Sequence, residues 1–140
     1  MQQEVNLKLN KSAWIVPALF VLLTWVIYII EIKFELNFNK YGIKPRNLEG
    51  LRGVIFTHFI HGDVKHLFNN SVPLFVLLLS LWYFYKEVAL KVLLFGALLS
   101  GLLTWCIARP SYHIGASGIV YLLFSFILFS GIIRKHFRLV

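Results

Sequence analysis

The stretch Gly115-Ala116-Ser117-Gly118 places a serine and two glycines at the point where a polar loop becomes a long apolar run. Glycine permits backbone conformations and close approaches that a side chain would prevent. Ser117 is predicted at or near the first turn of a helix, where amide N–H groups have no intrahelical acceptor and can stabilise an anion. The pattern therefore indicates either a helix cap with ordinary loop glycines or a serine beside half of an oxyanion hole.

The composition around this stretch is that of an integral membrane protein. Hydrophobic residues make up 59% of the 140 residues and charged residues only 14%, with a mean hydropathy of +0.74. A bilayer crossing needs about 20 apolar residues, and four segments qualify: 12–30, 67–85, 88–108 and 115–133. The first lacks a small-residue cleavage site, so no cleavable signal is predicted. We expect an all-α membrane bundle forming one domain over residues 1–140.

The charge pattern predicts lipid as a partner and sets the orientation. The net charge is +8, and in a membrane protein basic residues meet anionic head groups and determine topology. We therefore expect no nucleic acid partner. Basic residues are denser in the short segments on the side of the N-terminus, which favours a cytoplasmic N-terminus. In residues 31–65 apolar and polar residues are interleaved, so this connection is predicted to fold onto the membrane surface.

Two further polar residues are predicted to lie near Ser117. His66 and Asn70 are four residues apart and share one helix face at the start of the second span. With the expected topology, the second and fourth spans begin on the same side of the membrane. A polar cluster at membrane depth is costly unless it is satisfied or used, so these three residues form a candidate site.

Other chemistries find little support in the sequence. No acidic residue lies in the interior of a span, which counts against an aspartyl-type intramembrane protease, and no His-Glu-x-x-His motif indicates a zinc protease. His58, His61, Asp63 and His66 leave a metal site open as an alternative. The favoured interpretation needs neither a metal ion nor an organic cofactor.

Two motifs in order resemble the rhomboid family of intramembrane serine proteases. The run HGDVKHLFNN at residues 61–70 is followed later by Gly-Ala-Ser-Gly at residues 115–118 and by Tyr121. Leu51-Arg52 is similar to a Trp-Arg pair of the family, with Leu in place of Trp. The resemblance runs from about residue 42 to about residue 125 and implies a core of six transmembrane helices, four of which are visible here.

The resemblance also implies roles for individual residues. Ser117 would be the nucleophile that attacks the scissile carbonyl of a transmembrane substrate protein. The Ser117 amide and the side chains of His66 and Asn70 would hold the oxyanion. Tyr121 matches the tyrosine that packs on the catalytic histidine. His61 corresponds to a loop histidine with a structural or water-retaining role.

The general base is the point at which this sequence departs from the family pattern. In rhomboids the base is a histidine on the sixth span, whereas the sequence reaches Val140 after the fourth, so we expect the base to be missing from this chain. His136 lies 19 residues after Ser117, roughly 28 Å along a helix, and is expected at the opposite membrane face. His113 and His66 remain as alternatives. Leu122 stands where rhomboids often have a small residue, so packing against a sixth helix is expected to differ.

Two functions therefore follow from the sequence. The first is an intramembrane serine protease acting through an acyl-enzyme on Ser117. The alternative is a non-catalytic rhomboid-like protein that binds membrane helices as a chaperone or escort. The bacterial inner membrane is the expected location for either protein.

Overall fold

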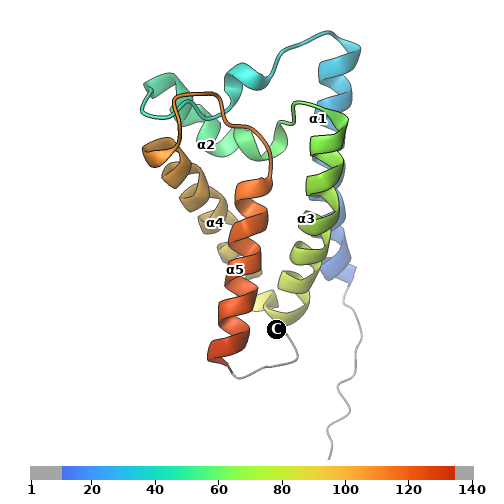
Figure 1. The fold of residues 1–140 in the computed structure, drawn as a ribbon. Coiled ribbons are helices and arrows are strands. Elements are labelled where there is room, and N and C mark those ends of the chain that lie inside the picture. Colours follow the sequence, from blue (N-terminus) through green and yellow to red (C-terminus); the bar gives the residue numbers. More distant parts are fainter. Residues whose placement is uncertain (1–10, 135–140) are drawn as a thin grey trace, which may run out of the picture.

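The computed structural model describes residues 11–134 and consists of long helices joined by short turns (Figure 1). In chain order the helices, with 3₁₀ turns labelled η, are α1 (Lys11–Lys33), η1 (Asn39–Tyr41), η2 (Leu48–Arg52), α2 (Gly53–Phe56), η3 (Thr57–Phe59), α3 (Val64–Phe84), α4 (Lys86–Ile107) and α5 (Ser117–Ile133). The all-helical expectation is confirmed. The predicted orientation rests partly on basic residues outside the described range, and it stays a prediction.

The four predicted spans correspond to α1, α3, α4 and α5, but they are not equally long. Three helices are long and apolar enough to cross a membrane: Ala13–Lys33, Val64–Phe84 and Lys86–Ile107. The fourth was predicted to begin at Gly115, whereas α5 begins at Ser117 and has 17 residues. It is shorter because Gly115 has a φ of +109° and Ala116 is the N-cap. At 1.5 Å per residue α5 extends about 25 Å, somewhat less than the roughly 30 Å hydrocarbon core.

The helices pack so that α5 lies between α3 and α4, while α1 runs beside α3 (Figure 1). Tyr85 alone separates α3 from α4. The buried core between these helices follows helical spacing and comprises Leu74, Leu78 and Leu81 of α3, Ala89 and Leu93 of α4, and Ile119, Leu123 and Ile127 of α5. The helix that begins at Ser117 thus also contributes side chains to the buried core.

Small residues allow close packing on two faces of α4. The side chain of Leu122 occupies the space in front of Gly96, so this departure from the family pattern is turned toward α4. On the other face, a methyl group at Gly101 would lie 2.7 Å from the backbone oxygen of Val54 in α2. The connection over residues 31–65, here called the surface loop, therefore packs directly on α4.

The connection over residues 31–65 is folded and anchored at the end of α4. Nη1 of Arg46 donates hydrogen bonds to the carbonyls of Cys106 (3.1 Å) and Ala108 (3.0 Å), and the Arg46 amide donates to Trp105 O (3.0 Å). Trp105 Nε1 donates to Asn47 O (2.9 Å) in return. The last carbonyls of a helix lack intrahelical donors, so a cationic guanidinium there satisfies them and suits the helix dipole.

Candidate active site

The loop that leads into Ser117 is tied to the surface loop by backbone hydrogen bonds. Ile43 and His113 form an isolated antiparallel bridge, with N–H to O distances of 2.9 and 2.8 Å. Thr57 contributes two more bonds, because its carbonyl accepts from Gly115 N–H (2.9 Å) and its hydroxyl donates to His113 O (2.8 Å). These bonds join segments more than 50 residues apart and fix the path of the chain just before Ser117.

Gly115 is the point where the predicted site residues come together. A methyl group at this position would lie 2.6 Å from Nε2 of His66, 2.7 Å from its Cε1 and 3.4 Å from Nδ2 of Asn70. The φ of +109° is likewise a conformation that L side chains rarely adopt. The ring of His66 and the amide of Asn70 therefore both lie against the backbone two residues before Ser117, as their shared helix face predicted.

The start of α3 sets the position of His66. Asp63 is the N-cap of this helix, and its carboxylate accepts a hydrogen bond from the His66 amide (2.8 Å). Asn70 follows one turn later and is buried, with 8% of its surface exposed. Its Nδ2 atom is buried and has no hydrogen-bond partner among the described residues. An amide donor thus faces the Ser117 loop with its hydrogen bond unmade.

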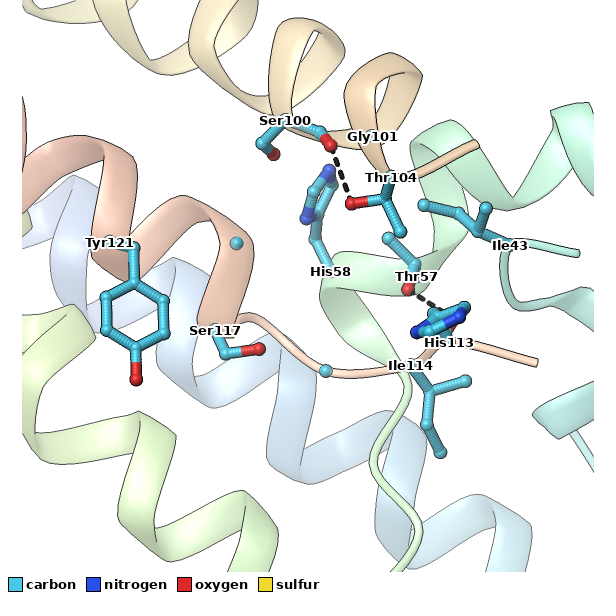
Figure 2. A pocket seen from close by; sticks show the side chains of 12 residues that line it. Ile43, Thr57, His58, Ser100, Gly101, Thr104, His113, Ile114, Ser117 and Tyr121 are labelled. Carbon is cyan, nitrogen blue, oxygen red and sulfur yellow. Dashed lines mark hydrogen bonds between the residues drawn. The ribbon is translucent and has the colours of Figure 1, made fainter. Parts of the chain in front are cut away.

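Ser117 is the first residue of α5 and is partly buried. Within residues 11–134 its hydroxyl makes no hydrogen bond, and its amide has no backbone acceptor. Figure 2 shows the hydroxyl pointing away from Tyr121, toward the side of the cavity where Ile114 and His113 lie. The predicted helix start is confirmed, and it leaves both the oxygen and the amide of Ser117 available.

His61 holds the loop at the residue before Ser117. Its Nε2 accepts a hydrogen bond from the Ala116 amide (3.3 Å), and its ring meets the His66 ring edge-on with centroids 5.1 Å apart. Burial, together with a smaller electrostatic contribution from the neighbouring His66, lowers the pKa of His61 to about 4. A neutral ring can accept at Nε2, so near pH 7 the histidine is in the state that this bond requires.

A cavity of about 190 Å³ adjoins Ser117 on the side of α4 (Figure 2). Its polar lining includes side chains that the sequence had not placed at the site, among them Thr57, His58, Ser100 and Thr104. His58 is buried and forms a 3.0 Å hydrogen bond with the carbonyl of Ala97, and burial lowers its pKa, partly opposed by that bond. No sequence motif marks Ser100 as a site residue, because its small size is the only feature visible in the sequence.

The candidate bases do not pair with Ser117 in the described part of the chain. His113 lines the same cavity, but its Nε2 is bonded to Arg109 O (2.9 Å). His66 contacts Gly115, as described above, and His136 lies outside the described residues. Tyr121, one helical turn after Ser117, is 73% exposed, so its ring presents an open face beside the site.

The alternative of a metal site is not supported by the geometry. Nε2 of His58 is directed to Ala97 and that of His61 to Ala116, so the two rings use these nitrogens on different partners. No group of three or more His, Cys, Asp or Glu residues in the described range lies close enough together to hold a metal ion.

Comparison with known proteins gives one family match and several relatives. A family model described as "Rhomboid domain" matches residues 49–139. An uncharacterized protein of Mycobacterium tuberculosis H37Rv is 33% identical over 145 residues, which cover 94% of this chain and 59% of that protein. One from Mycobacterium leprae is 28% identical over 150 residues, with 96% and 57% covered. The chain thus spans somewhat more than half the length of these relatives. No solved structure matches it significantly.

Proposed function

The chain belongs to the rhomboid family, and from this premise we propose that it is the catalytic part of a serine endopeptidase that cleaves transmembrane proteins. It is an integral membrane protein, in keeping with its rhomboid domain and its long apolar helices. With a cytoplasmic N-terminus, the Ser117 loop faces the outer side of the bacterial inner membrane. Substrate is then cut near the outer surface, where water is at hand.

The convergence of His66 and Asn70 on Gly115 is the observation that supports this proposal. Two side-chain donors lie against the loop that ends in the Ser117 amide, and Asn70 Nδ2 is buried without an acceptor. An oxyanion hole needs such donors fixed in advance at the place where negative charge develops. Removing one donor of a hole of this kind costs about 2.7–4 kcal/mol of transition-state stabilisation.

In the proposed reaction the Ser117 oxygen attacks the scissile carbonyl and its proton passes to a general base. The carbonyl oxygen becomes the oxyanion, held by the Ser117 amide, His66 and Asn70. As this intermediate collapses, the base returns the proton to the leaving nitrogen, so the amine product is released and an ester is left on Ser117. The family resemblance assigns the base to a histidine of the sixth span, and the exposed ring of Tyr121 offers that histidine a surface to pack on.

Hydrolysis of the ester needs water at a site surrounded by apolar helices. The cavity beside Ser117 is large enough for several water molecules, since a water occupies roughly 30 Å³ of liquid volume. It is lined by hydroxyls and by His58, whose lowered pKa keeps the ring uncharged near pH 7. We assign this cavity the role of supplying the hydrolytic water.

The decisive experiment uses the full-length product of the gene in proteoliposomes with a single-span substrate. Ser117→Ala should abolish cleavage and also labelling by a fluorophosphonate, which reacts only with an activated serine. Ser125→Ala is the matched control, because Ser125 is an exposed serine on the same helix, and it should cleave and label like the parent. Undiminished cleavage by Ser117→Ala would refute the assignment of Ser117 as the nucleophile.

One observation favours the second candidate, a non-catalytic protein that binds membrane helices. Within residues 11–134 no histidine is hydrogen-bonded to the Ser117 hydroxyl. A binding protein would not need that bond. The same labelling experiment separates the two functions, since a full-length protein whose Ser117 labels no faster than Ser125 is not a protease.

A further inference from the structure

An apolar groove of about 410 Å³ lies between α1 and the surface loop, away from Ser117. Its walls are Ile27 of α1, Phe38, Tyr41, Phe56, Phe59 and Ile60. This volume falls within the range of pockets that hold small molecules. The groove is not part of the proposed catalytic machinery, and its lining is almost wholly hydrocarbon, so it suits an alkyl chain rather than a polar ligand.

The groove lies close to the end of α1 that carries Lys33. Ile27 lies six residues before Lys33, the last residue of α1, which is about 9 Å along the helix axis. The short turns that form the other wall lie at the same end of the bundle as the end of α1 (Figure 1). Ile55, which precedes the lining residue Phe56, is also exposed, at 63%. This surface is therefore suited to contact with lipid.

Two cations stand over one wall of the groove. Lys40 Nζ lies 5.3 Å from the ring centroid of Tyr41, and Arg52 Cζ lies 4.8 Å from the same centroid. Arg52 also donates from Nη2 to the carbonyl of Lys40 (3.1 Å), which fixes its position beside η1. Both side chains are exposed. A guanidinium has five N–H donors, so most remain available to an anion.

One acidic group also lies beside the groove. Glu31 accepts a hydrogen bond from the Phe38 amide (2.8 Å) and so lies on the Phe38 side. The Phe38 ring adjoins the Tyr41 ring, with centroids 6.2 Å apart, so the two cations at Tyr41 outnumber the one carboxylate at this end of the groove. Apolar walls with a localised positive rim match a molecule that has an alkyl chain and a negatively charged head.

We propose that this groove binds one anionic phospholipid of the bilayer, with an acyl chain against Phe56 and Phe59 and the phosphate at Lys40 and Arg52. A lipid bound in the groove would also affect the loop before Ser117. Phe59 and Thr57 belong to the same turn, η3, and Thr57 is hydrogen-bonded to Gly115 and His113. The lipid therefore braces the turn that fixes the catalytic loop.

The test is photocrosslinking of the full-length protein in nanodiscs. Phosphatidylglycerol or phosphatidylcholine, each with the same diazirine-bearing acyl chain, is irradiated and the labelled peptides are mapped by mass spectrometry. We expect phosphatidylglycerol to label residues 53–60 more strongly than phosphatidylcholine does. Lys40→Gln should lower that labelling about fivefold, from the typical contribution of one basic residue at an anionic surface, without changing labelling by phosphatidylcholine.

Two variants guard against trivial explanations. Lys91→Gln removes an exposed cation from α4 and should leave labelling of residues 53–60 unchanged. Arg52→Lys keeps the charge but loses the fork of N–H donors, and should keep most of the preference for phosphatidylglycerol. Equal labelling by the two lipids, or labelling spread evenly over the lipid-facing helices, would overturn the proposal whether or not the protein is a protease.

Discussion

Replacing Gly115 by alanine tests the geometry of the candidate site most directly. The new methyl group would lie 2.6 Å from His66 Nε2, so the ring must withdraw by about 0.8 Å to reach an ordinary contact of 3.4 Å. Overpacking of this kind costs about 1–3 kcal/mol. The φ of +109° adds a further penalty of about 1–3 kcal/mol for a residue with a side chain. We therefore expect Gly115→Ala to lower the free energy of unfolding by about 2–6 kcal/mol.

The same change should also impair the reactivity of Ser117. Under the proposed function, a displaced His66 would no longer donate to the oxyanion, and loss of one such donor slows comparable reactions by about 10²–10³. The assay is the rate of fluorophosphonate labelling, measured on the full-length protein in detergent beside chemical unfolding of the same samples. Labelling should fall about a hundredfold even at temperatures where the variant is folded.

Gly62→Ala is the matched control, because it makes the same chemical change four residues before His66. A methyl group at Gly62 would meet only Ile114 Cδ1, at an ordinary 3.4 Å. Adding His66→Ala to Gly115→Ala should recover the overpacking part of the lost stability, but neither the backbone part nor the labelling. If Gly115→Ala and Gly62→Ala unfold and label alike, the convergence of His66 on Gly115 is refuted.

Three further predictions follow from other contacts. Gly101→Ala should destabilise by about 1–3 kcal/mol because its methyl group meets the backbone of Val54, whereas Gly96→Ala meets the flexible end of Leu122 and should cost less in chemical unfolding. The pKa of His61 is lowered from 6.5 to about 4, so between these pH values the folded state binds fewer protons than the unfolded state, and the free energy of unfolding should fall as the pH drops from 6.5 toward 4. His61→Gln still accepts a hydrogen bond from the Ala116 amide but does not titrate, so it should flatten the dependence of stability on pH. An unchanged pH dependence would contradict the assignment. Asn70→Leu removes a buried donor that has no partner, so unfolding should require as much denaturant as in the parent or more, while the rate of Ser117 labelling falls about a hundredfold. If stability and labelling are lost together, the Asn70 amide has a structural role instead.

The parts of the fold that depend on local chemistry were predictable from the sequence. Hydropathy located the long helices, and the four-residue spacing of His66 and Asn70 placed both side chains on the face that meets Gly115. The glycines around Ser117 predicted a helix start there, which is confirmed. The spacing did not reveal that α5 is only 17 residues long, because the backbone conformation of Gly115 and Ala116 decides where the helix begins.

The contacts that fix the Ser117 loop were not predictable in this way. The bridge between Ile43 and His113, and the bonds from Thr57 and His61, join residues more than 50 positions apart. No local pattern specifies such pairings, since any hydroxyl, carbonyl or imidazole in the surface loop could have served as a partner. His58 was noticed in the sequence only as a potential metal ligand, because its role as a cavity wall depends on how η3 packs on α4.

These long-range bonds explain why the site can keep donors without acceptors. The surface loop pairs with the amides of Gly115 and Ala116, which fixes the backbone on the approach to Ser117. A free, mobile loop would instead shift to satisfy the amide of Asn70, because an unpaired buried donor costs about 1–3 kcal/mol. The tethers remove that freedom, so the donor stays directed at the Ser117 loop with its hydrogen bond unmade. Under the proposed function, the negative charge that forms during attack supplies the missing acceptor. The free-energy cost of the unpaired Asn70 donor is then removed in the transition state.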